Sequence, residues 1–350
     1  MRLGAQASWC SGTCAHAFRS LPVAADGVSG DSPQRLPQRR MADKKVILAL
    51  VAKPATQYAH SLMKRNLEKR RQFADIVWQG RSISIEYEWL NRERTDAPLM
   101  LFLHEGLGSL SMWRDFPARL CEAAGIQGLV FSRYGYGHST TRSAQEQWGG
   151  DFVQVQATEL IPSFLKSAGV RPDQPLWLFG HSDGGSIALI MAAHDPARYA
   201  GVIVAAPHTS IDALTAQGVS VSRKAFFDGV TKTGLQRHHA DAQSVVMGWA
   251  DSWLTPESLQ WTIVPLLASI TCPLLAIQGE HDAYGMLEQI RVIPRHVPHA
   301  RLLELKDCGH IPHFEMPDTV IKASVAFMQS VCDAGHAGAE QEPAGVPSPE

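Results

Sequence analysis

The most informative stretch of this 350-residue chain is Leu178-Phe179-Gly180-His181-Ser182-Asp183-Gly184-Gly185-Ser186-Ile187-Ala188. It contains the pattern G-x-S-x-G, with an apolar run before it and a helix-like run after it. In that setting small residues let the backbone bend sharply from strand into helix, and the serine hydroxyl emerges at the carboxyl end of a sheet. The bare pattern is a weak signal, because glycine and serine are common. The strand-turn-helix setting makes Ser182 a candidate nucleophile.

A serine hydroxyl needs a base to take its proton, and in this arrangement an acid and then a histidine follow the nucleophile along the chain. The apolar run 273–277 leads into a loop that carries Asp282, and residues 303–306 lead into a loop that carries His310. Polar residues at the carboxyl ends of parallel strands gather at one edge of the sheet. We therefore expect Ser182, Asp282 and His310 to form a catalytic triad. The alternative for each is a polar loop residue without a catalytic role.

A fourth element is a site for a developing negative charge. The buried run 101–103 leads into His104-Glu105-Gly106-Leu107-Gly108, a glycine-rich loop. Its amide near Gly106 and the amide of Asp183, at the start of the helix, are the expected oxyanion donors. The loop lacks the second histidine of the zinc-binding pattern H-E-x-x-H, and His238 and His239 are adjacent and face different directions. The sequence therefore predicts no metal site and no cofactor.

Short apolar runs alternate with helical segments along most of the chain. Strands are expected at 75–78 and 83–89 as a hairpin, then at 99–103, 128–131, 176–179, 201–205, 273–277 and 301–304; helices are expected at 111–124, 152–168, 184–194, 286–293 and 316–331. Such alternation predicts an α/β fold with a mostly parallel sheet flanked by helices. Residues 207–270 are too long for a simple crossover and carry Trp249, Trp253 and Trp261, so we expect them to form an inserted helical cap.

Composition and charge exclude several classes of protein. The chain has 45% hydrophobic and 19% charged residues and a net charge of −2, as is ordinary for a soluble globular protein. No apolar run approaches the roughly 18 residues that a membrane span needs. Residues 1–71 hold 13 Lys or Arg against four acids. No aromatic residues interleave with these basic ones as stacking on bases requires, so nucleic-acid binding is not expected. Six sparse cysteines favour reduced thiols and a cytoplasmic location.

The two ends of the chain differ from its middle. Residues 1–53 lack sustained periodicity, which predicts a disordered or leader extension, and Cys10 and Cys14 lie in it. Residues 54–74 have helical spacing and predict a basic helix. The catalytic core is then expected at 75–206 and 271–332, interrupted by the cap at 207–270. Residues 333–350 are rich in Gly, Ala, Glu and Pro and predict a disordered tail.

Across about residues 75–332 the chain resembles the α/β-hydrolases. His104-Glu105-Gly106 stands where that family usually has a His-Gly pair, Gly180 to Gly184 resembles its nucleophile elbow, and Cys308-Gly309-His310 resembles its histidine loop. Residues 132–139 resemble the loop after its fourth strand, which usually begins with Asp where this chain has Ser132. The resemblance implies the α/β-hydrolase fold and leaves the substrate open.

Two acids stand where the family usually has neutral residues, Glu105 beside the oxyanion loop and Asp183 directly after the nucleophile. If both face the pocket and are ionised, they disfavour an anionic acyl group and favour a neutral or amine-bearing substrate; the alternative is that they bond to nearby backbone. Arg133 either binds a substrate carboxylate or pairs with an acid of the protein. Trp249 and Trp253, four residues apart, either line the pocket or pack the cap on the core.

The function expected is a cofactor-independent serine hydrolase that cleaves an ester, thioester or lactone of a small molecule through an acyl-enzyme. The family to which the chain is similar also contains dehalogenases and epoxide hydrolases, whose nucleophile is an aspartate at the position of Ser182. The serine found here therefore excludes these two activities. A C–C bond hydrolase of the meta-cleavage type stays open, although His181 and Ile311 depart from its pattern. A non-catalytic member that binds a ligand is the third reading, and a homodimer is left open.

Overall fold

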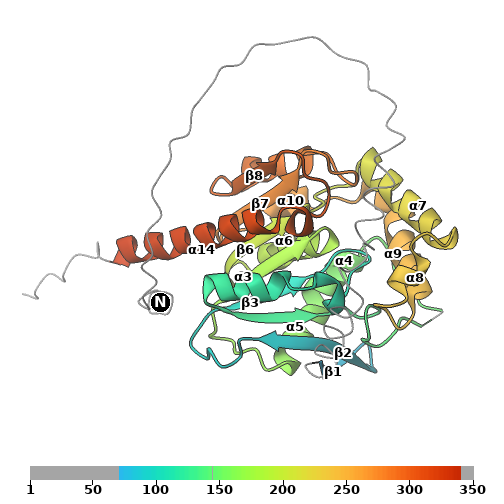
Figure 1. The fold of residues 1–350 in the computed structure, drawn as a ribbon, viewed down its shortest axis with the longest axis horizontal. Coiled ribbons are helices and arrows are strands. Elements are labelled where there is room, and N and C mark those ends of the chain that lie inside the picture. Colours follow the sequence, from blue (N-terminus) through green and yellow to red (C-terminus); the bar gives the residue numbers. More distant parts are fainter. Residues whose placement is uncertain (1–70, 144, 340–350) are drawn as a thin grey trace, which may run out of the picture.

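A computed structural model describes residues 71–143 and 145–339. They form an eight-stranded sheet, and helices lie on both of its faces (Figure 1). The strand order is β1-β2-β4-β3-β5-β6-β7-β8, and the sheet is parallel from β4 to β8. The strands are β1 (Gln72–Trp78), β2 (Arg81–Leu90), β3 (Leu99–Leu103), β4 (Gln127–Phe131), β5 (Leu176–His181), β6 (Tyr199–Ala205), β7 (Leu274–Gly279) and β8 (Arg301–Leu305). The α/β fold predicted from the alternating runs is confirmed.

The antiparallel edge begins with the expected hairpin of β1 and β2. Trp78 pairs with Arg81 across a two-residue turn in which Gln79 and Gly80 both have positive φ, the conformation that matches the twist of a hairpin. Residues 72–74 belong to β1, so the prediction of a helix over 54–74 is wrong for its last three residues. From Phe73 to Val77 the side chains alternate between exposed and buried, which is strand rather than helix periodicity. Arg71 is not helical either, and residues 54–70 and the extension 1–53 lie outside the described residues.

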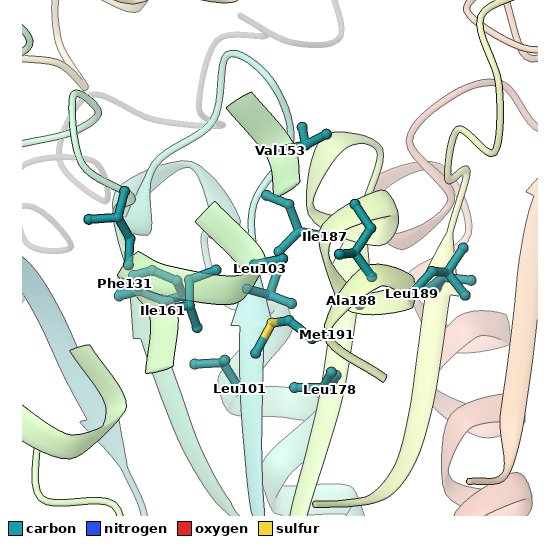
Figure 2. Close-up of a cluster of buried hydrophobic side chains, with 14 of the residues drawn as sticks. Leu101, Leu103, Phe131, Val153, Ile161, Leu178, Ile187, Ala188, Leu189 and Met191 are labelled. Atoms are coloured by element: carbon teal, nitrogen blue, oxygen red, sulfur yellow. The ribbon is translucent and has the colours of Figure 1, made fainter. Parts of the chain in front are cut away.

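Strands β3 to β7 are buried on both faces, as their continuous apolar runs predict, whereas β8 at the edge of the sheet is exposed at Arg301 and Leu302. Along β3, Leu101 and Leu103 face one layer of helices, and Met100 and Phe102 face the other. Figure 2 shows the first of these layers, where Leu101, Leu103 and Leu178 of the strands meet Ile187 and Met191 of helix α6. The helix that follows the nucleophile is therefore packed tightly against the two strands beside it.

Helices α3 (Phe116–Ala124) and α14 (Pro317–Ala339) cover one face, and α5 (Ile161–Ser167) and α6 (Asp183–His194) cover the other. Several expected helices are interrupted where the backbone or a proline forces a break. The segment 110–124 divides into a 3-10 turn (Leu110–Trp113) and α3, and 152–167 divides into α4 (Phe152–Val155), a π turn (Gln156–Leu160) and α5. The helix expected at 286–293 is two short helices, α11 (Glu288–Arg291) and α12 (Ile293–His296), and Pro294 is the second residue of α12.

The segment between β6 and β7 is helical, as its length predicted. It contains α7 (Ala213–Phe227), α8 (Lys232–Leu235), α9 (Ala242–Leu254), a 3-10 turn (Ser258–Gln260) and α10 (Val264–Leu267). Helices α7, α8 and α9 lie together at one end of the sheet, at the right of Figure 1. Its status as a separate cap domain over residues 207–270 stays a prediction.

The last helix is longer than expected. Helix α14 runs to Ala339, so residues 333–339 are helical where a disordered tail was predicted from 333 onward. Ala334, Ala337 and Ala339 favour a helix and Gly335 and Gly338 oppose it, so the stretch continues a helix that Val320, Phe327 and Met328 already anchor to the core. Residues 340–350 lie outside the described residues.

Candidate active site

Ser182 lies at a sharp turn between β5 and α6. Its backbone has φ 53° and ψ −118°, a strained conformation for a residue with a side chain. Gly180 and Gly184 are required because neighbouring backbone atoms leave no room for a side chain at either position. A Cβ on Gly180 would lie 2.2 Å from the Gly184 carbonyl oxygen, and one on Gly184 would lie 1.9 Å from the Leu103 carbonyl oxygen. The turn predicted from G-x-S-x-G is therefore observed, with its glycines required by contact.

The structure brings Ser182, His310 and Asp282 together from the ends of three different strands. The Oγ of Ser182 lies 2.9 Å from Nε2 of His310, and Nδ1 of His310 lies 2.8 and 2.9 Å from the two carboxylate oxygens of Asp282. A carboxylate only accepts, so Nδ1–H donates to Asp282 and Nε2 is left to accept the serine proton. All three side chains are at least nine-tenths buried. The arrangement can deliver a serine oxygen to an acyl carbon.

The surroundings of Asp282 keep it ionised. Burial by itself raises the pKa of this carboxyl, but the charge and hydrogen bond of His310 and the amide of Tyr284 outweigh burial, and the pKa is lowered. The Tyr284 amide donates to Oδ1 over 2.8 Å, and the side-chain amide of Gln278 donates to Oδ2 over 3.1 Å. Because both oxygens are held, the carboxylate is fixed in the plane that His310 needs.

Sequence reasoning missed the group that holds the histidine loop. The carboxylate of Glu315 accepts from the amides of Gly309 (2.8 Å) and Ile311 (3.0 Å), one on each side of His310. A Cβ on Gly279 would lie 2.2 Å from the Cys308 carbonyl oxygen, so β7 and this loop are in direct backbone contact. In the sequence, the signal for this contact was an acidic residue, Glu315, five positions after His310.

The two expected oxyanion donors lie beside the serine. Gly106, Ser182 and Asp183 line the same pocket. Asp183 is the first residue of α6, and an amide at that position has no acceptor within its own helix. Trp249 covers Gly106 so closely that a Cβ there would lie 1.9 Å from the indole Nε1. The amides are thus near the serine, and only a glycine fits at position 106.

The two unusual acids are both paired. Oε2 of Glu105 lies 3.5 Å from Nδ1 of His181, whose Nε2 bonds to the His310 carbonyl oxygen over 2.8 Å. Burial raises the pKa of Glu105, but the hydrogen bond and charge of His181 outweigh it, and the pKa is lowered. Asp183 has its Oδ2 3.5 Å from Arg133, and its Oδ1 accepts from Trp249 Nε1 over 3.4 Å. Burial raises the pKa of Asp183, and Arg133 opposes the rise.

Arg133, expected among the residues of a substrate pocket, does not line the pocket beside Ser182. The side chain is fully buried, and the pocket walls do not include it. Its guanidinium pairs with Asp183, the second of the two roles expected for it. The serine that replaces the usual aspartate in the same loop is also explained. Oγ of Ser132 donates to Glu86, whose carboxylate also accepts the His138 amide, so Glu86 supplies the charge from β2.

The pocket beside the serine encloses about 400 Å³ of empty space, including the open solvent at its mouth. Glu105, Trp249 and Trp253 are among its walls, as expected. Both tryptophans are also more than nine-tenths buried in the core. Trp249 and Trp253 therefore both line the pocket and pack against the core. Sequence reasoning did not assign the remaining walls of this pocket, which are Leu107, His208, Thr215, Val219 and Tyr284. The position of His208, three residues after β6, was a usable signal.

Within the part of the chain that the structure describes, no three His, Cys, Asp or Glu side chains gather in a way that could hold a metal ion. His239 instead accepts the Gly137 amide (2.9 Å) and bonds to the Leu107 carbonyl oxygen (3.0 Å). Among residues 71–143 and 145–339, none of the helices combines the length and the apolar character that a membrane crossing needs.

Similarity to solved structures is extensive in fold and low in sequence. A membrane phospholipase A described as a bacterial virulence factor aligns with a TM-score of 0.61 at 20% identity, over 84% of this chain and 98% of that one. A thermophilic esterase from Thermogutta terrifontis aligns at 0.56 and 19% identity, over 75% and 98%. The enol-lactonase from Burkholderia xenovorans aligns at 0.56 and 20% identity, over 74% and 100%. At such identities the likeness shows the fold.

Among curated proteins, the monoglyceride lipase of Mus musculus is 28% identical over 108 residues, which is 31% of this chain and 34% of that protein. The monoglyceride lipase of Homo sapiens is 29% identical over 109 residues, with the same coverage. The chain thus spans about a third of the length of the curated relatives it matches. A sequence profile of the Alpha/beta hydrolase family matches residues 100–323. Since that match spans more than half of the chain and includes the elbow, the acid and the histidine, this protein belongs to the alpha/beta hydrolase family.

Proposed function

We propose that this protein is a serine hydrolase that cleaves a carboxylic ester of a small neutral molecule through an acyl-enzyme. The observation that carries the proposal is the chain of hydrogen bonds from Ser182 through His310 to Asp282, which opens into a pocket. The esterase and the enol-lactonase among the structural neighbours have the same fold. Thioesters and lactones present the same acyl carbon and are included.

In the proposed reaction, Nε2 of His310 takes the proton of Ser182 as Oγ attacks the acyl carbon. The carbonyl oxygen becomes an oxyanion, and the amides of Gly106 and Asp183 donate to it; each such donor is typically worth about 3 kcal/mol. The C–O bond then breaks, and His310 gives its proton to the departing alcohol. Water attacks the acyl-enzyme, gives a proton to His310, and the acid leaves as Ser182 regains that proton. Asp282 holds His310 in the tautomer that both steps need.

The pairing of the two acids favours a neutral substrate over an amine-bearing one. A cationic substrate needs a carboxylate whose charge is not already matched. Asp183 is matched by the permanent charge of Arg133 and accepts from Trp249, and Oε2 of Glu105 lies 3.5 Å from Nδ1 of His181, an ion-pair distance when that ring is protonated. The pocket walls that remain are largely apolar, with Leu107, Val219, Trp249, Trp253 and Tyr284 among them. A short, uncharged acyl group fits these walls.

The first test is the Ser182→Ala variant, assayed with p-nitrophenyl acetate and with a fluorophosphonate probe that labels active serines. We expect turnover and labelling to vanish while the far-UV circular dichroism stays that of the wild type. The matched control is Ser324→Ala on α14, a buried serine whose hydroxyl bonds only within its helix, and it should retain both activities. Undiminished turnover by folded Ser182→Ala protein would overturn the proposal.

A substrate panel separates the alternatives. Hydrolysis of acetate, butyrate and thiobutyrate esters and of a γ-lactone is expected to exceed that of an aminoacyl ester or a hemi-ester of a dicarboxylic acid. Loss of colour with a yellow ring-cleavage dienoate, without ester turnover, would identify a C–C hydrolase instead. Neither turnover nor labelling of the wild type would favour the ligand-binding reading. The cytoplasmic location and the homodimer stay predictions from the sequence.

A further inference from the structure

Arg133 lies in the loop after β4, behind the oxyanion loop, and is entirely shielded from solvent. Its Nη2 donates to the Glu105 carbonyl oxygen over 2.9 Å and lies 3.5 Å from Oδ2 of Asp183. The guanidinium also lies over the Tyr136 ring, 4.4 Å from the ring centroid. One buried cation therefore contacts the residue before Gly106 and the residue after the nucleophile.

The contact with Glu105 bears on the Gly106 amide because both belong to one peptide unit. In a planar trans peptide, the C=O and the N–H point in opposite directions. A guanidinium that fixes the Glu105 oxygen thus fixes the direction of the Gly106 N–H. His104 strengthens the same anchor: its Nε2 accepts the Arg133 amide over 3.0 Å, which leaves Nδ1–H to donate to the Glu105 oxygen over 2.7 Å. Hydrogen bonds at the carbonyl also polarise the N–H of that unit.

The contact of Arg133 with Asp183 affects the second expected oxyanion donor, which is the backbone amide of Asp183. The Asp183 amide starts α6, and its carboxylate is held from two sides by Arg133 and by Trp249. An uncompensated carboxylate at this position would repel an oxyanion formed on the substrate. A guanidinium keeps its positive charge in proteins, so it offsets that carboxylate while restraining the residue.

We propose that Arg133 is a positioning residue, which holds the amides of Gly106 and Asp183 in the geometry that an oxyanion requires. It touches no substrate and acts through the Glu105 carbonyl and the Asp183 carboxylate. This inference rests on the proposed function, because an oxyanion forms only if Ser182 attacks an acyl carbon. The wild type is therefore assayed first: failure of ester turnover and of fluorophosphonate labelling would overturn the function itself, and with it the role assigned to Arg133.

The test compares Arg133→Gln with Arg142→Gln. Arg142 is a matched control, because its guanidinium also lies over an aromatic ring, that of Trp148, and donates to backbone carbonyls, those of Glu146 and Ser244. None of these groups belongs to the oxyanion loop. For Arg133→Gln we expect kcat for p-nitrophenyl acetate to fall about 10- to 100-fold with KM within about threefold, somewhat less than loss of a donor itself. For Arg142→Gln we expect kcat within about twofold.

A second readout reports the oxyanion directly. An alkyl trifluoromethyl ketone adds to an active serine as a hemiketal, whose oxygen occupies the oxyanion position. In Arg133→Gln its inhibition constant should rise by the factor by which kcat/KM falls. The pH at which the bound hemiketal loses its proton, followed by ¹⁹F NMR, should also rise, which a general loss of stability would not produce. Wild-type kcat and inhibition constant in folded Arg133→Gln would overturn the proposal.

Arg133→Gln leaves the Asp183 carboxylate buried and unpaired, which can prevent folding. The double variant Arg133→Gln/Asp183→Asn removes both charges and avoids that penalty. It should fold and still show the reduced kcat and the weakened ketone binding, because the Glu105 carbonyl has lost its cation. Recovery of wild-type kcat in the double variant would overturn the proposal.

Discussion

Replacing Gly184 by alanine perturbs a close contact between the start of helix α6 and the end of strand β3, beside Ser182. The added Cβ would lie 1.9 Å from the Leu103 carbonyl oxygen and 2.7 Å from that of His104. Real Cβ atoms essentially never come within 3.0 Å of such an atom. Helix α6 and the end of β3 must therefore separate by about 1 Å. Because β3 leads directly into the oxyanion loop, the movement changes the distance between Ser182 and Gly106.

Two effects on stability oppose each other in this variant. Alanine in the first turn of a helix gains about 0.5–1 kcal/mol over glycine. Forcing extra volume between packed backbones costs typically about 1–3 kcal/mol, and here neither atom belongs to a flexible side chain. We expect a net loss of about 2 kcal/mol in the free energy of unfolding. A displacement of about 1 Å in a catalytic geometry costs about 100-fold in rate, which is the expected fall in kcat.

The neighbouring glycine supplies the control. A Cβ on Gly185 would lie 3.0 Å from Cβ of Pro207, a tight contact that a small shift relieves. Gly185→Ala has the same gain in helix propensity, so we expect its stability within about 1 kcal/mol of the wild type and its kcat within about threefold. Urea unfolding followed by tryptophan fluorescence gives the stabilities, and p-nitrophenyl acetate hydrolysis gives kcat.

Gly184→Ala and Gly185→Ala are expected to differ, and like behaviour of the two variants would contradict the contact-based explanation. Folded Gly184→Ala protein with the kcat of Gly185→Ala would mean that α6 and β3 can separate without moving the oxyanion loop. Equal losses in both variants would mean that the effect comes from the backbone of the helix rather than from contact with Leu103.

Two further predictions concern the stability of the protein at low pH and the length of the acyl chain that the pocket accepts. Burial lowers the pKa of His208 and His239 from 6.5 to about 4, so the unfolded chain binds protons there that the folded chain does not. The free energy of unfolding should therefore fall as the pH drops from 6.5 towards 4, by up to about 3 kcal/mol per histidine, and a flat profile in urea melts would contradict this. Trp253→Ala should enlarge the pocket and raise kcat/KM for p-nitrophenyl octanoate relative to acetate by about tenfold. Trp177→Phe, buried under the opposite face, should leave that ratio unchanged; no change in Trp253→Ala would show that its indole does not limit chain length.

Several departures from expectation have local causes that the spacing of residues does not contain. The loop after β4 lacks the usual aspartate, yet Glu86 of β2 supplies a carboxylate to Ser132 across the sheet. Arg133 is typical of a residue that binds a substrate anion, and only its burial and its contact with Asp183 show otherwise. Residues 72–74 of the helix expected over 54–74 belong to β1 instead, because pairing with β2 outweighs the local helical pattern.

Local sequence determined the elements of this protein and the order of its reactive residues. Continuous apolar runs predict strands buried on both faces, and glycines around Ser182 predict a turn, because both depend on neighbours along the chain. The tertiary structure decided which charges are available. Glu105 with His181, Asp183 with Arg133, and Glu315 with the loop around His310 join residues that lie on different elements. Electrostatic pairing depends on distance in space and on burial, and neither is encoded in spacing along the sequence.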